Sequence, residues 1–300
     1  MMQKHNNNTG ADFSSELIPS FLLPEHLIKA EEKSKENQNV IDISAKQDTR
    51  QKHSRLVIRD SLYNAVECNH IDLFMQPIVT LPQRRTKFYE LFGRLNIKSG
   101  NFLPAKDYIS LAYEENMIAP LDTIILSHGL KTLQKHKTHD AISYFVNIKP
   151  FILRNQYFMQ ELLSYISKNK ALAERLVFEI TAQDFLHLSP DECKVMRALA
   201  QIGCRFSIDH APTLPKDIKS LRAHNVSFIK IDAQTLKEKG ETDEGFEDLL
   251  SRKHTLYVNG IEVIVQKIED EQALLDCLDY EVNFGQGYLF GRPDFESVYR

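Results

Sequence analysis

The pattern of apolar and polar positions divides the chain into two parts. Up to about residue 52 it is rich in Asn, Ser and charged side chains, whereas from Leu56 onward apolar residues recur at the spacing of helices and strands. The first part cannot bury enough apolar surface to offset its ordering entropy. We therefore expect residues 1–52 to be a disordered, low-complexity tail and residues 53–300 to be one folded domain.

One apolar stretch interrupts this tail. It runs from Leu17 to Ile28 and contains Pro19 and Pro24. Two interpretations stay open: a short docking motif for another protein, or an apolar cluster that has no partner.

Beyond residue 56, short apolar runs alternate with amphipathic stretches, which predicts a regular alternation of strands and helices. Helices are expected near residues 56–69, after Pro104, after Pro120, and near 150–170, 189–203, 215–225, 246–253 and 270–280. Strands are expected near residues 72–81, 87–97, 141–148, 175–181, 204–209, 226–232, 261–268 and 286–290.

The order of these elements predicts the fold class. The first two strands are separated only by a short turn and form an antiparallel pair, in which Pro77 indicates an edge strand or an irregular one. The later strands alternate with helices, as in a parallel α/β sheet. About eight strands, with no GxGxxG turn after the first, favour a closed (β/α)8 barrel of the TIM type over an open sheet.

Composition narrows the class of protein less than the pattern does. The net charge of −4 argues against a main partner that is nucleic acid. The four cysteines lie far apart, which is typical of reduced thiols in a cytosolic protein. No run approaches the ~18 apolar residues of a membrane span, and the N-terminus has no secretory h-region. We expect a soluble, cytoplasmic protein.

Polar residues end almost every predicted strand, where the active sites of βα barrels lie. A single one would usually be solvated or cap the next helix, but several on successive strands converge on one point. Carboxylates gathered in this way suit Mg²⁺, Mn²⁺ or Ca²⁺, and a lysine beside them can neutralise a phosphate or accept a proton. This combination indicates metal-assisted phosphodiester hydrolysis. The residues are Glu90, Asn147, Glu179, Asp209, Lys230, Asp232, Gln266 and Glu269.

Several motifs, in order along the region from Ile71 to Pro293, resemble those of the EAL domain, the cyclic di-GMP-specific phosphodiesterase fold. MQPIV is similar to YQPIV, YELFGRL to the EALLR signature, FVNI to VNLS, and FEIT and FIKID to the EIT and KID segments. QGYLFGRP is similar to QGYLFSRP. The resemblance covers about three quarters of the chain.

The resemblance implies a role for each matching residue. Glu90, Asn147, Glu179 and Asp209 fall where the family binds its metals, which would be Mg²⁺ or Mn²⁺ here. Lys230 falls where a lysine of the family helps to position or activate the attacking water, and Glu269 matches the second Glu of AEGVE. Residues in ligand-contacting segments are Gln76, Arg94, Asp232 and Gln286.

The departures from the family pattern fall on the side of the site where the resemblance places the second metal ion. His210 replaces the second Asp of DDFG, Gln266 replaces the first Glu of AEGVE with Lys267 after it, and Ala182 replaces the second Glu of EITE. Phe92 adds bulk beside Glu90. Since His210 and Gln266 remove two carboxylates, we expect a degenerate site that holds metal weakly or holds a single ion.

Three functions follow from this resemblance. The first is a catalytically inactive or very weak effector or interaction module that binds cyclic di-GMP and needs no cofactor. The second is a slow, metal-dependent phosphodiesterase that gives linear pGpG. The third is a nucleotide-free protein scaffold. A protein partner could bind through the tail or the barrel surface, and the divergent pattern is similar to alphaproteobacterial EAL proteins linked to motility.

Overall fold

The computed structural model of the protein describes residues 48–97, 101–135 and 142–295. The Leu17–Ile28 stretch and residues 1–47 of the predicted tail lie outside the described residues. The first helix, α2 (Asp48–Glu67), reaches five residues into the segment that we assigned to the tail.

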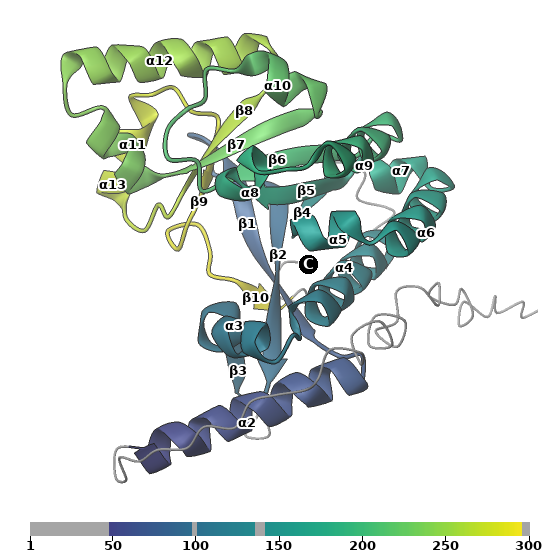
Figure 1. Cartoon of the computed structure of the whole chain (residues 1–300). Coiled ribbons are helices and arrows are strands. Elements are labelled where there is room, and N and C mark those ends of the chain that lie inside the picture. The colour runs from purple at the N-terminus through teal and green to yellow at the C-terminus, as the bar shows by residue number, and fades with distance from the viewer. Residues whose placement is uncertain (1–47, 98–100, 136–141, 296–300) are drawn as a thin grey trace, which may run out of the picture.

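Eight strands close into a barrel, as the alternation predicted (Figure 1). Their order around the barrel is β1-β9-β8-β7-β6-β5-β4-β2, and β2 pairs again with β1. Strand β1 is antiparallel to both of its neighbours, whereas the adjacent pairs from β2 round to β9 are parallel. The antiparallel first strand is therefore confirmed. The bounds are β1 (Asp72–Thr80), β2 (Thr86–Asn96), β4 (Ser143–Asn147), β5 (Leu176–Thr181), β6 (Arg205–Asp209), β7 (Val226–Asp232), β8 (Glu262–Gln266) and β9 (Phe284–Gln286).

Two short strands extend the sheet beyond the barrel. β3 (Phe102–Pro104) pairs with the end of β2, and β10 (Asp294–Phe295) pairs with β1 at Phe74 and Met75. Pro77 is not on an edge, because β1 has neighbours on both sides, so that alternative is wrong. The irregular alternative is confirmed, since the β1–β2 register shifts between Ile78 and Val79.

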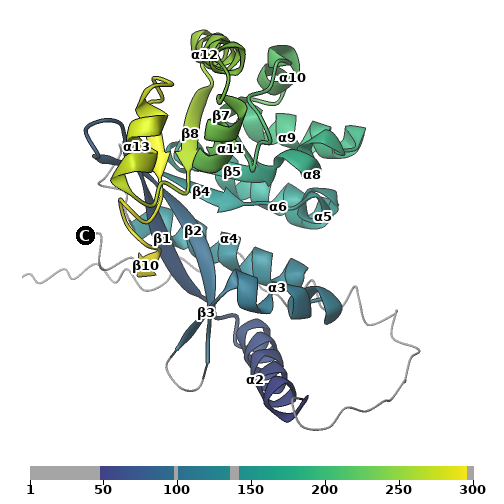
Figure 2. The same ribbon diagram turned by 90° about the vertical axis from the view of Figure 1, so that its left-hand side faces the viewer.

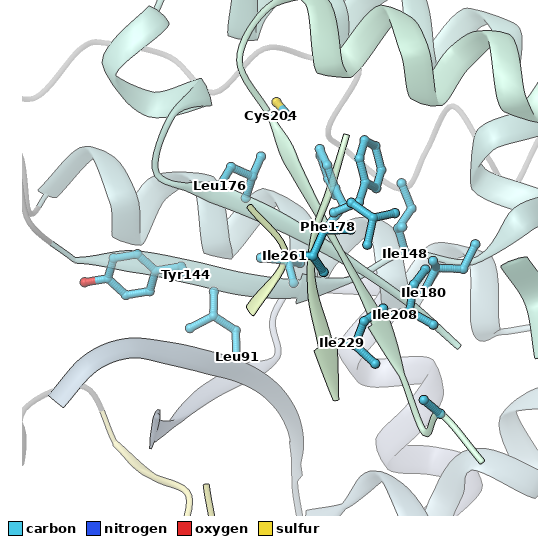
Figure 3. Packing of buried hydrophobic residues seen from close by; sticks show 14 of the residues in the cluster. Leu91, Tyr144, Ile148, Leu176, Phe178, Ile180, Cys204, Ile208, Ile229 and Ile261 are labelled. Carbon is cyan, nitrogen blue, oxygen red and sulfur yellow. The ribbon is translucent and has the colours of Figure 1, made fainter. Parts of the chain in front are cut away.

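Helices cover the outside of the barrel (Figure 1). They are α4 (Ile118–Lys135), α5 (Pro150–Arg154), α6 (Gln156–Ser167), α7 (Lys170–Ala173), α8 (Ala182–Leu186), α9 (Pro190–Gln201), α10 (Ile218–Ala223), α11 (Ala233–Lys239), α12 (Asp243–Val258) and α13 (Glu271–Leu278), whereas α3 (Ala105–Glu114) lies beside β3. Residues that point outward from the strands, such as Phe178, Ile208 and Ile229, pack in the large core beneath these helices (Figure 3).

Some boundaries differ from the prediction for local reasons. The single helix expected over residues 150–170 is divided into α5 and α6, because Asn155 leaves the helical conformation and its side chain caps α6 by accepting from the Phe158 N–H. A further short helix, α7, begins at Lys170. Helix α11 was missed, and α4 begins two residues before Pro120. The last barrel strand ends at Gln286, where we expected it to begin. The start of α9 is confirmed, with Pro190 in its first turn and a capping box between Ser189 and Glu192.

The β1–β2 pair extends beyond the barrel as a two-stranded ribbon, and a second hydrophobic core packs against it (Figure 2). Helices α2, α3 and α4 bury apolar side chains there, including Leu62, Tyr108 and Ile124. Gly93 lets α4 pack closely against β2, since a Cβ at this position would lie 2.6 Å from Cδ1 of Ile125. Among the described residues, no helix is long and apolar enough to cross a membrane.

Candidate functional site

Side chains of a strand alternate between its two faces, so residues two positions apart both point into the barrel. Successive inward positions of the strands therefore form two layers in the barrel interior. The lower layer, the plug, is mostly apolar, and its aromatic rings meet across the barrel: the centroids of Phe88 and Phe228 are 5.3 Å apart, and those of Phe145 and Phe228 are 5.0 Å apart. The plug comprises Ile78, Phe88, Phe145, Val177, Ser207, Phe228, Ile264 and Phe284.

Two positions from each plug residue, towards the carboxyl ends of the parallel strands, lies a polar one. These eight side chains form what we call the polar layer: Gln76, Glu90, Asn147, Glu179, Asp209, Lys230, Gln266 and Gln286. Seven of them are buried and Asn147 is half-buried. All eight were singled out from the sequence, and the structure places one on each strand of the barrel.

Lys230 lies at the centre of this layer. Its Nζ is 2.7 Å from Oε2 of Glu90, 2.7 Å from Oε1 of Glu179 and 3.0 Å from Oε2 of Glu179. The side chains of Lys230 and Glu179 are 0% exposed. Oε2 of each glutamate accepts a hydrogen bond from this ammonium, whereas Oε1 of Glu179 is an ion-pair contact that accepts no hydrogen bond.

Burial acts on both partners of this ion pair. Burial, together with the nearby carboxylate of Glu90, raises the pKa of Glu179 well above its usual range. Burial alone would lower the pKa of Lys230, but the carboxylates of Glu179 and Glu90 outweigh it and raise that pKa above its ordinary value. The contacts with Glu90 and Glu179 therefore favour the charged ammonium form of Lys230.

Glu90 connects this ion pair to the glutamines of the layer. Nε2 of Gln286 donates to Oε2 of Glu90 at 2.7 Å and to Oε1 of Gln76 at 3.2 Å. Gln76 in turn donates to the carbonyl of Gly291 at 3.0 Å. A continuous chain of hydrogen bonds thus runs from Lys230 to the loop after β9.

Asp209 is bound by the residues that depart from the family pattern. Gln266 donates its amide N–H to Oδ1 of Asp209, and the backbone N–H of His210 donates to the same oxygen at 2.7 Å. The His210 ring is exposed, with Nε2 3.4 Å from Oδ2 of Asp209. Its φ of +51° is left-handed, which costs a non-glycine residue energy.

Lys267 and Asp232 form an ion pair at the rim of the barrel, above the polar layer. Nζ of Lys267 is 2.6 Å from Oδ2 of Asp232, and Lys267 is also left-handed with φ of +58°. Glu269 is exposed past the end of β8, and no hydrogen bond of the described chain joins it to the polar layer. Ala182 begins α8, whose cap is Thr181, so it adds no polar atom to the site.

The ribbon forms a wall above the layer. Phe92 and Arg94 follow Glu90 on the same face of β2, and Phe74 lies opposite Phe92 on β1. The Arg94 guanidinium lies 5.5 Å from the ring centroids of both Phe74 and Phe92, and burial lowers its pKa. We call Phe74, Phe92 and Arg94 the mouth wall. A base and a phosphate can both be bound by such a surface.

Asp122 on α4 was missed by sequence reasoning. Its Oδ2 is buried and accepts no hydrogen bond, and burial, partly opposed by Lys149, raises its pKa to about 7. Tyr108, whose pKa burial raises to about 12, is within electrostatic reach of both Asp122 and Arg94. In the sequence Asp122 is one polar position in an amphipathic helix, with nothing to distinguish it from a solvated one.

The arrangement does not fit the divalent cation that the resemblance implied. In the part of the chain that the structure describes, no three His, Cys, Asp or Glu side chains come together so that they could hold a metal ion. One contact gives a reason: an amide N–H of Gln266, where the family motif has a glutamate, points at Asp209. The Lys230 ammonium also contacts Glu90 and Glu179, but a lysine at this position belongs to the family pattern.

Fold and site together define a βα barrel whose carboxyl-end mouth combines buried carboxylates, a lysine and an aromatic–arginine wall. The chain belongs to the EAL domain family, whose family model matches residues 59–293.

Curated relatives are distant and longer. The chain is 22% identical over 245 residues to cyclic di-GMP phosphodiesterase PdeF of Escherichia coli, covering 81% of this chain and 32% of PdeF. It is 21% identical over 234 residues to cyclic di-GMP phosphodiesterase PdeA of Borreliella burgdorferi, covering 78% of this chain and 35% of PdeA. The chain thus spans about a third of these relatives.

Solved structures show the same fold. The FimX EAL domain of Pseudomonas aeruginosa bound to c-di-GMP superposes with a TM-score of 0.65 at 23% identity, covering 79% of this chain and 96% of that one. The PaMucR phosphodiesterase in its c-di-GMP complex gives 0.69 at 17% identity, covering 81% and 99%.

Proposed function

We propose that this domain binds cyclic di-GMP at its mouth and does not hydrolyse it efficiently, so that it acts as an effector or interaction module. The observation that carries the proposal is the contrast within the polar layer. The residues that match the family's ligand-contacting segments, Gln76 and Gln286, are retained, whereas Gln266 gives Asp209 an N–H donor where the family motif has a second carboxylate.

The mouth offers groups for each part of the ligand. Cyclic di-GMP has two anionic phosphates, for which Arg94 supplies a planar, permanently charged donor. Its guanines can stack on the aromatic rings of the mouth wall.

Calorimetric titration with cyclic di-GMP tests the proposal, with Arg94→Ala as the binding variant. Arg197→Ala is the matched control, because Arg197 is an exposed residue of α9. We expect saturable binding by the wild type and the control, and a loss of about tenfold or more in Arg94→Ala, since a desolvated charged contact is worth ~1.5–3 kcal/mol. No binding by the wild type would leave the scaffold interpretation.

A slow phosphodiesterase is the second candidate, because the relatives above are named as such enzymes and Glu90, Glu179, Asp209 and Lys230 are all present in the layer. Prolonged incubation with Mg²⁺ or Mn²⁺ tests it. Linear pGpG that disappears in Glu90→Ala would support hydrolysis, and pGpG that persists in this variant would come from a contaminant. The cytoplasmic location, the motility link and a protein partner for the tail stay predictions.

A further inference from the structure

We propose that Lys267 is a phosphate contact of the mouth, on the side opposite Arg94, and that His210 supplies a second donor beside it. A cyclic dinucleotide is then held through both of its phosphates without a divalent ion. The inference rests on the proposed binding of cyclic di-GMP and deepens it by naming the groups that bind the phosphates. Both residues depart from the family motifs, which have a glycine and an aspartate at these positions.

The side chains of Lys267 and His210 turn back over the mouth. Each directly follows an inward-pointing residue at the end of a strand, Gln266 or Asp209, so in a regular strand it would point away from the barrel. Both are instead left-handed, with φ of +58° and +51°, which costs a lysine or a histidine energy that a glycine would not lose. Nζ of Lys267 thereby lies 2.6 Å from Oδ2 of Asp232, and Nε2 of His210 lies 3.4 Å from Oδ2 of Asp209.

Both groups keep donor capacity for a ligand. The side chain of Lys267 is 59% exposed and that of His210 is 56% exposed. Among the described residues, Asp232 is the only hydrogen-bond partner of the Lys267 ammonium, which has three N–H donors. The neighbouring Gln266 carries no charge, whereas a glutamate there would repel a phosphate.

Lys267 and Arg94 lie on opposite sides of the mouth. Asp232, to which Lys267 is bound, ends β7, and Arg94 belongs to β2; β6, β5 and β4 separate these strands on one side, and β8, β9 and β1 on the other. In the polar layer below, groups of the same two strands meet directly, since Nζ of Lys230 is 2.7 Å from Oε2 of Glu90. The two phosphates of cyclic di-GMP lie on opposite sides of its ring, so one can contact Arg94 and the other Lys267.

Calorimetric titration with cyclic di-GMP in the presence of EDTA tests the proposal. The wild type should bind, and Lys267→Met should lose about tenfold in affinity because a charge-assisted contact with the anion is removed. Lys267→Arg should retain most of the affinity, and the loss in Lys267→Met should add to that in Arg94→Ala, since the two contacts lie on different phosphates. Lys237→Met is the matched control, because Lys237 is also 59% exposed and ion-paired with an aspartate, Asp276.

A second variant and a second condition complete the test. His210→Asp, which returns the residue of the family motif, should weaken binding at least as much, because it places a negative charge beside the phosphate. Equal affinities of the wild type and Lys267→Met, or wild-type binding that appears only when Mg²⁺ is added, would overturn the inference and leave the proposed function intact. No binding by the wild type in EDTA or in Mg²⁺ would refute both.

Discussion

Replacing Lys230 by Met should destabilise the barrel in a way that depends on pH. Methionine keeps the unbranched length of the side chain but removes the ammonium. Glu90 and Glu179 would then face each other inside the barrel without the donor that lies within 3.0 Å of both. Removing one partner of a buried ion pair costs ~3–5 kcal/mol because the remaining charge is uncompensated. For a domain whose total stability is ~5–15 kcal/mol, this is a large fraction.

The pH dependence follows from the direction of the Glu179 pKa. It is already raised in the folded protein, and Lys230 is the neighbour that opposes the rise, so Lys230→Met should raise it further. A carboxyl with a raised folded pKa destabilises the fold when it must ionise, and this penalty vanishes below its unfolded value of 4.5. Lys230 itself stays charged throughout this window. The loss of stability should therefore be largest near neutral pH and shrink towards about pH 5.

Urea unfolding followed by circular dichroism at about pH 7.5 and about pH 5 measures this. Lys216→Met controls for charge, and Lys230→Met/Glu90→Gln should recover part of the loss because it leaves one acid in place of two. A loss below about 1 kcal/mol at the higher pH, or an equal loss at both, would refute the reasoning, since neither is compatible with a buried, compensating ammonium.

Three further predictions test other parts of the structure. Asp122→Asn should stabilise the fold above about pH 7 by at most ~4 kcal/mol and have little effect near pH 4, because a pKa raised to about 7 makes ionisation costly; urea midpoints independent of pH would contradict this. Gly287→Ala should cost ~3 kcal/mol or more in urea unfolding, because its Cβ would lie 2.0 Å from the Ile268 carbonyl oxygen; a normal midpoint would show that the loop yields easily. Ser189→Ala should cost ~1 kcal/mol in thermal unfolding, since it removes a capping box with Glu192; an unchanged melting temperature would show that the cap is redundant.

The fold was predictable because short apolar strands alternate with amphipathic helices along the chain. In β2, β4, β7 and β8, an inward apolar residue is followed two positions later by a polar one, as in Phe88–Glu90 or Phe228–Lys230, and this marks both the strand and its functional end. Helix boundaries were less predictable because they depend on single side chains. The break at Asn155 requires its side chain to leave the helix and cap the next one, which apolar periodicity does not reveal.

The residues of the site could be predicted from the sequence, but the hydrogen bonds and ion pairs between them could not. All eight residues of the polar layer could be named from strand ends and motifs, yet nothing in the sequence indicates that Gln266 donates to Asp209 or that Lys230 binds two glutamates. Such contacts depend on closure of the barrel, which joins residues as far apart as Gln76 and Gln286. Asp122 was missed for the same reason, since its carboxylate is buried by neighbours distant in sequence.

The retained carboxylates also have a structural reason to be present. Lys230, fully buried, requires Glu90 and Glu179 as partners, and Glu90 additionally holds Gln286, which orients Gln76 towards the loop after β9. Replacing either glutamate would leave a buried ammonium or amide with an unsatisfied donor, which costs stability whether or not the domain hydrolyses a nucleotide. The presence of Glu90 and Glu179 therefore carries little weight as an argument for catalysis. Gln266 is the more informative residue, because an amide there gives the adjoining Asp209 a donor in place of a second metal-binding charge.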